Sequence, residues 1–148
     1  MSIARGPEML RLTRRYRFCA SHRLHSPALS EAENRELYGK CNNPHGHGHD
    51  YLLEITVAGP LETKTGKLVN VTQMDCLVDE SILRSMDHRD LNSEVPEFAH
   101  MVPTSENLAL AIGRRLNESW TACFGSGGPQ LDNVRLHETR RNRFELKP

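Results

Sequence analysis

The sequence predicts an α+β fold in which an antiparallel sheet carries two helices on one face. Three observations support it: apolar and polar residues alternate in two long segments, apolar residues recur at helical spacing in two further segments, and alternation returns in two short segments near the end of the chain. The predicted order is therefore β-β-α-α-β-β. Strands that follow one another pair antiparallel, and two helices between them cover one face of the sheet.

The first predicted strand is 9–22, where alternate residues from Leu10 to His22 share one face and arginines occupy much of the other. The second is 49–58, where the residues from His49 to Val57 alternate with polar neighbours. Between these strands, Ser30 is followed by Glu33 at the spacing of a capping box, which predicts a short helix.

The first long predicted helix is 72–86, and the second is 103–120, whose first residues Pro103 and Thr104 suit a helix start. The apolar stripes of both helices have the spacing of a buried face. These stripes are Met74, Leu77, Val78 and Ile82, and then Leu108, Ile112, Leu116 and Trp120. The closing strands are predicted at 131–138 and 142–147.

Length and composition predict one domain, 9–148, after a short N-terminal tail, 1–8. Apolar residues make up 37 % of the 148 residues, and the net charge is zero. The charge balance argues against a general nucleic-acid surface, and no segment approaches the roughly 20 apolar residues of a membrane span. None of the four cysteines forms a C-x-x-C pair, and the N-terminus lacks the apolar stretch of a secretory signal, so we expect free thiols in a cytoplasmic protein.

The segment CNNPHGHGHD, 41–50, concentrates metal ligands. His47 and His49 are two residues apart, so in extended chain they point to the same face. His22 ends the first strand and meets them if the first two strands pair. Three imidazoles suit Zn²⁺ and leave a fourth coordination position open, as catalytic sites do. The alternative is a histidine-rich surface loop without metal, which is how we interpret His25 and His45.

Cys41 has three interpretations that its spacing does not separate. It completes a closed zinc site as a fourth ligand, it stands beside the metal as a thiolate base, or it is an inert buried thiol. Asp87 next to His88 forms either a carboxylate–imidazole unit for proton transfer or a solvated helix end. Cys19 and Cys76 receive no role.

Glu138 shares a predicted strand face with Val134 and Leu136, where a carboxylate is costly without a partner. One partner is an arginine of the segment that follows: Arg140, Arg141 or Arg143. The other is a ligand whose guanidine-like edge matches both carboxylate oxygens.

The motifs CASHRLH, CNNPHGHGH, MDHRDLN, PTSENLA and HETRRN together resemble the 6-pyruvoyltetrahydropterin synthase family, from about residue 10 to the C-terminus. The resemblance implies the tunnelling fold (T-fold), in which three subunits close their sheets into a barrel and two trimers stack into a homohexamer. It places the active sites between subunits. Some burial between subunits also agrees with the modest apolar fraction.

The same resemblance implies roles for individual residues. His22, His47 and His49 would bind Zn²⁺, Cys41 would be the catalytic base, Asp87 and His88 would relay protons, and Glu138 would anchor a pterin ring at the catalytic centre. Thr104, Ser105 and Glu106 match a second pterin-contacting loop. The implied reaction converts 7,8-dihydroneopterin triphosphate to 6-pyruvoyl-tetrahydropterin and releases triphosphate. Candidate cations for that leaving group are Arg14, Arg15, Arg17, Arg23 and Lys40.

Two rival functions are retained. One is 6-carboxytetrahydropterin synthase of the queuosine (deazapurine) pathway, which uses the same fold, metal and substrate. Its members usually have three residues between the cysteine and H-G-H, whereas five separate Cys41 from His47 here, which favours the pyruvoyl enzyme. The other rival is a non-catalytic zinc-binding module in which Cys41 is the fourth ligand.

Overall fold

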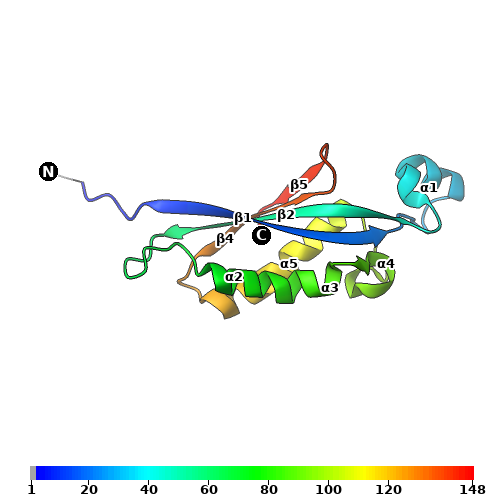
Figure 1. Ribbon diagram of the computed structural model, residues 1–148. Coiled ribbons are helices and arrows are strands. Elements are labelled where there is room, and N and C mark those ends of the chain that lie inside the picture. The colour runs from blue at the N-terminus through cyan, green and yellow to red at the C-terminus, as the bar shows by residue number, and fades with distance from the viewer. Residues whose placement is uncertain (1–2) are drawn as a thin grey trace.

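A computed structural model of the chain describes residues 3–148 and contains one twisted five-stranded sheet (Figure 1). Its strands lie in the order β3-β1-β2-β4-β5. Their bounds are β1 (Met9–His22), β2 (His47–Pro60), β3 (Arg89–Asp90), β4 (Gln130–His137) and β5 (Arg143–Leu146). The four predicted strands are confirmed to within two residues at each end. Residues 3–8 precede β1 as exposed, irregular chain, and positions 1–2 of the predicted tail lie outside the described residues.

The prediction of a wholly antiparallel sheet is wrong at one edge. β1–β2, β2–β4 and β4–β5 are antiparallel, but β3 pairs parallel with β1, with Ala20 opposite Arg89 and Ser21 opposite Asp90. A strand of two residues shows no alternation, so its sequence carries no signal of it.

The predicted helix 72–86 is continuous helical chain, but it comprises three pieces. α2 (Val71–Val78) and α3 (Arg84–Met86) are joined by a π turn, η2 (Asp79–Leu83). The second predicted helix is α5 (Ser105–Phe124), and Thr104 is its N-cap. Short turns, α4 (Leu91–Glu94) and η3 (Pro96–Phe98), connect α3 to α5. The structure also confirms the capping box of α1 (Glu31–Tyr38), between Ser30 and Glu33.

The core lies between the sheet and the layer formed by α2, α3 and α5, which cover one face of the sheet (Figure 1). Both predicted apolar stripes are buried there, as are Tyr51, Leu53 and Ile55 of β2. No helix of residues 3–148 combines the length and the hydropathy that crossing a membrane requires.

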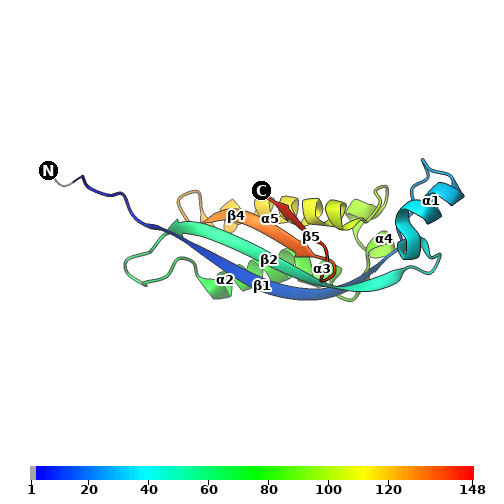
Figure 2. The same ribbon diagram turned by 90° about the horizontal axis from the view of Figure 1, so that it is seen from above.

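β1 and β2 form a long hairpin, and α1 lies at its far end, away from the helical layer (Figure 2). A 3-10 turn, η1 (Gly39–Asn42), leads from α1 towards β2. Buried amides fix this connection: the Asn34 side chain donates to the Ser26 and Leu29 carbonyls, and that of Asn42 donates to the Leu24 carbonyl at 2.8 Å. Cys41, in η1, accepts a hydrogen bond from the Leu24 backbone N–H at 2.7 Å, so its place beside the end of β1 is defined.

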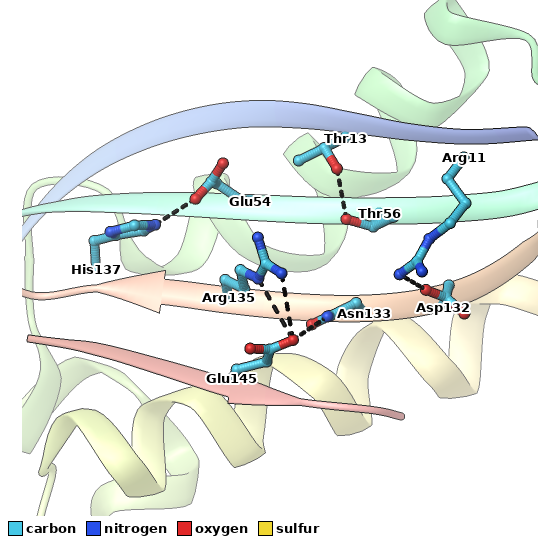
Figure 3. A network of polar contacts seen from close by, with 9 residues as sticks. All are labelled: Arg11, Thr13, Glu54, Thr56, Asp132, Asn133, Arg135, His137 and Glu145. Atoms are coloured by element: carbon cyan, nitrogen blue, oxygen red, sulfur yellow. Dashed lines mark hydrogen bonds and ion pairs between the residues drawn. The ribbon is translucent and has the colours of Figure 1, made fainter.

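The sheet face opposite the helices carries a polar network (Figure 3). Thr13 and Thr56 hydroxyls lie 2.7 Å apart, His137 contacts Glu54, and Asn133 donates to Glu145. Glu54 is only 7 % exposed, although it lies on the face that the helical layer leaves uncovered.

Candidate metal centre and catalytic site

Three histidines meet where β1 ends and β2 begins. His22 is opposite His47 in the antiparallel register, and His49 lies opposite Ala20. The ring centroids are 5.4 Å apart for His22 and His47, 4.9 Å for His22 and His49, and 4.5 Å for His47 and His49. The pairing that the sequence left conditional is therefore present, and it brings the three imidazoles together.

Two of these rings carry a nitrogen without a hydrogen-bond partner in residues 3–148, and both nitrogens are buried. His22 is fully buried, and its Nδ1 lies 2.9 Å from the Pro103 carbonyl oxygen, which can only accept. Nδ1 therefore carries the proton, and the unpartnered Nε2 holds a lone pair. The Nε2 of His49 is unpartnered as well. Burial lowers the pKa of His22 to about 4 and also lowers the pKa of His49, so both rings stay neutral, the form that binds a metal.

Cys41 joins the histidines. The ligand atoms of His22, Cys41, His47 and His49 all lie within 4.8 Å of one another. The Cys41 Sγ is 2.8 Å from the His47 Nε2. In a tetrahedral zinc site, bond lengths of about 2.0–2.1 Å to nitrogen and 2.3 Å to sulfur put N and S roughly 3.5 Å apart. The Cys41 sulfur and the His47 nitrogen are thus in direct contact, closer than two ligands of one zinc ion would be, and the donor set fits a zinc ion with Cys41 as either a neighbour or a ligand.

Asp87 and His88 lie in the turn after α3, held by the backbone of Cys19. The Cys19 N–H donates to the Asp87 carboxylate at 2.9 Å, and the His88 N–H donates to the Cys19 carbonyl at 2.6 Å. The His88 Nδ1 is 3.1 Å from the same carboxylate oxygen. His88 has φ of 59°, the one positive φ of a non-glycine residue in the described chain. Strained backbone of this kind is concentrated at functional sites.

The His88 side chain is exposed and lines a cavity of about 440 Å³, whose wall also contains His49. The Asp87–His88 unit and the histidine cluster therefore border the same space. Cys19, for which no role was predicted, lines it as well, and its thiol donates to Asp50 at 2.7 Å.

Glu138 lies one residue beyond β4, a correction to its predicted place within the strand. Its Oε1 is 3.2 Å from the His49 Nε2, outside hydrogen-bond geometry, and the side chain is 16 % exposed. Among the described residues it makes no ion pair with the three arginines that follow it. The carboxylate therefore faces the histidine cluster.

The start of α5 separates three residues that the sequence grouped. Thr104 caps α5 by accepting a hydrogen bond from the Asn107 N–H at 3.1 Å, while Glu106 is exposed. The Ser105 hydroxyl is buried and has no partner in the described chain. The alternation of the second strand put Tyr51 on one face with His49, and no functional role was predicted for it. Its hydroxyl is buried and unpartnered among residues 3–148, and its ring lies 5.6 Å from that of His49. The signal for Tyr51 was its place on the same strand face as His47 and His49.

Comparisons with known proteins agree on one family. The sequence model described as 6-pyruvoyl tetrahydropterin synthase matches residues 11–148. The 6-pyruvoyl tetrahydrobiopterin synthase of Drosophila melanogaster is 45 % identical over 132 residues, which cover 88 % of this chain and 75 % of the relative. The solved structure of Caenorhabditis elegans 6-pyruvoyl tetrahydropterin synthase superposes with a TM-score of 0.84 at 33 % identity, covering 96 % of this chain and 97 % of that one. The 6-carboxy-5,6,7,8-tetrahydropterin synthase of Rickettsia conorii is 26 % identical, over 88 % of this chain and 95 % of its own.

Proposed function

The chain belongs to the 6-pyruvoyl tetrahydropterin synthase family and is an enzyme, and from that premise we propose that it is a zinc-dependent lyase. Its proposed reaction converts 7,8-dihydroneopterin triphosphate to 6-pyruvoyl-tetrahydropterin with elimination of triphosphate. The observation that carries the proposal is the pair of buried, neutral and unpartnered imidazole nitrogens, of His22 and His49, beside Cys41.

His22, His47 and His49 would hold the zinc ion. When bound, zinc would supply Lewis-acid polarisation of the substrate's side-chain hydroxyls. Three protein ligands leave a position for the substrate, and the Pro103 carbonyl keeps the His22 ring in the tautomer that presents its Nε2.

The remaining residues would move protons and hold the substrate. Cys41 as thiolate takes a proton from a side-chain carbon, and His88, oriented by Asp87, returns a proton at another carbon. The C–O bond to the leaving group breaks, and triphosphate departs with the electron pair. Glu138 accepts the guanidine-like edge of the pterin through both oxygens. Thr104, Ser105 and Glu106 are proposed as further pterin contacts.

We further propose a homohexamer, a dimer of trimers, in which three sheets close into a barrel. The face opposite the helices is available for this assembly, since no helix of the described chain covers it. A single domain, 9–148, and a cytoplasmic location complete the proposal. The four cysteines are free, which suits a reducing compartment.

Two other functions remain to be tested against this one. The 6-carboxytetrahydropterin synthase activity has less support, because the relative of that name is 26 % identical and the pyruvoyl relative 45 %. Mass spectrometry of the products from 7,8-dihydroneopterin triphosphate separates the two. A product that has lost a two-carbon fragment would favour the carboxy enzyme.

The contact between Cys41 and His47 favours testing the zinc-binding module as well. In the Cys41→Ala variant, we expect zinc content to stay at the wild-type level and turnover to fall about 10²–10⁴-fold, the usual cost of removing a positioned base. Zinc lost in proportion to activity would instead make Cys41 a ligand.

A further inference from the structure

A second cavity lies at the far end of the β1–β2 hairpin, between the end of β1 and the chain around α1 and η1. It has a volume of about 420 Å³, and its wall contains Arg23, Arg35 and Asn42. Arg23 directly follows the predicted zinc ligand His22, and Asn42 directly follows Cys41. Two residues of the cavity wall are therefore the chain neighbours of residues in the proposed catalytic centre.

The wall of this cavity carries a net positive charge. Neither Arg23 nor Arg35 makes an ion pair with a carboxylate within the part of the chain that the structure describes. Glu31 is the one carboxylate residue in the lining, so two guanidinium groups face one carboxylate, and His25 adds an imidazole. Guanidinium groups in a concave site favour anions, above all phosphate groups, which match their donors in pairs.

Arg23 is held in place before any ligand arrives. The Asn92 side chain accepts from the Arg23 backbone N–H at 2.7 Å and donates to its carbonyl at 2.9 Å. The Arg23 Nε donates to the Asn42 carbonyl at 3.3 Å, which leaves the two terminal amino groups available for an anion. A binding group fixed in this way loses less entropy when its ligand binds.

The other candidate arginines are poorly placed within one subunit. Arg14 is bound to Asp75 through two hydrogen bonds, of 2.6 and 2.7 Å. Arg15 pairs with Glu54 at 3.3 Å. At about 3.3 Å per residue of strand, these arginines lie roughly 23–26 Å along β1 from His22, and Arg17 lies roughly 16 Å from it. Arg23 is the candidate arginine that lines the cavity.

We propose that Arg23 and Arg35 form an anion subsite that binds the triphosphate group of the substrate. The inference rests on the proposed lyase function and assigns a place to its leaving group. Charge-assisted hydrogen bonds from both guanidinium groups stabilise the charge that develops on the departing triphosphate as its bond to carbon breaks.

The test measures binding of inorganic triphosphate to the zinc-loaded full-length protein by calorimetry. Arg35→Ala is the informative variant, because Arg35 lies on exposed α1 and outside the proposed metal centre. Arg114→Ala is the matched control, since Arg114 is an exposed arginine outside both cavities, and its side-chain hydrogen bond in the described chain goes to the Leu110 carbonyl of its own helix, at 3.4 Å. We expect Arg35→Ala to weaken triphosphate binding about tenfold or more, as for other hydrogen bonds to charged groups. Zinc content should stay unchanged, and Arg114→Ala should behave as wild type.

Arg23→Lys and Arg23→Ala complete the series, with zinc content measured in each because Arg23 neighbours His22. We expect the substrate's KM to rise in Arg35→Ala more than kcat falls. ATP is the comparison ligand that shares the triphosphate but lacks the pterin. It should lose affinity in Arg35→Ala and bind wild type more weakly than 7,8-dihydroneopterin triphosphate.

Equal triphosphate affinity in wild type, Arg35→Ala and Arg114→Ala would overturn the subsite. Tighter binding of ATP than of the pterin triphosphate would overturn its assignment to the substrate. If wild-type protein fails to convert the pterin triphosphate while Arg35→Ala still weakens inorganic triphosphate binding, the proposed reaction is wrong and the anion subsite remains.

Discussion

Gly46 directly precedes His47, at a position where the backbone leaves no room for a residue with a Cβ. Its φ is 68°, and a Cβ built at this position would lie 2.7 Å from the His22 carbonyl oxygen and 3.2 Å from its carbon. Gly46→Ala therefore adds a left-handed conformation that costs about 1–2 kcal/mol in a residue with a Cβ. It also adds an overlap with main chain, which cannot rotate away as a side chain can, at a cost of about 1–3 kcal/mol.

Together these effects should lower the free energy of unfolding by roughly 2–5 kcal/mol. Because the displaced atoms belong to His22, we expect zinc affinity to fall as well. Gly48→Ala is the matched control, since Gly48 has no positive φ and its Cβ would lie at an ordinary 3.7 Å from the Ala20 carbonyl. That variant should change stability by less than about 1 kcal/mol.

Urea unfolding at one fixed protomer concentration measures both variants, and zinc content after dialysis against a weak chelator measures the site. The control of concentration matters because an oligomer's apparent stability depends on it. If Gly46→Ala and Gly48→Ala unfold at the same urea concentration and retain the same zinc, the close approach of Gly46 to His22 does not constrain the loop.

Three further outcomes are expected. Alanine at any one of His22, His47 and His49 should remove zinc and activity together, and full zinc occupancy in one of these variants would exclude that histidine as a ligand. The Arg14 hydrogen bonds lower the pKa of Asp75, so Asp75 stabilises the fold above its ordinary pKa of about 3.9 and this contribution is lost as the pH falls through the lowered folded value. Asp75→Asn should thus cost less than about 1 kcal/mol at neutral pH for this partly exposed pair, and the difference from wild type in urea unfolding should disappear in acid. A cost that persists unchanged in acid would contradict this assignment. Light scattering should give a hexamer, or at least a trimer, whereas a monomer at assay concentration would contradict the proposed barrel.

Most of the helices and strands were predictable from the local periodicity of the sequence. β1, β2 and α5 were predictable because each strand or helix must bury one face. The residues of that face recur at fixed short intervals along the chain, so the sequence shows them directly. The capping box at Ser30 and the shared face of His47 and His49 were predictable for the same reason.

The sequence by itself thus determined the kinds of element, their order and the residues able to bind a metal. Tertiary structure alone decided which of these residues meet. The register of β1 with β2 brings His22 to His47, the amide contacts of η1 place Cys41 beside them, and Asn92 positions Arg23 at the second cavity. Such contacts join residues far apart in the chain, and they depend on how the whole sheet pairs and packs, which no local pattern records.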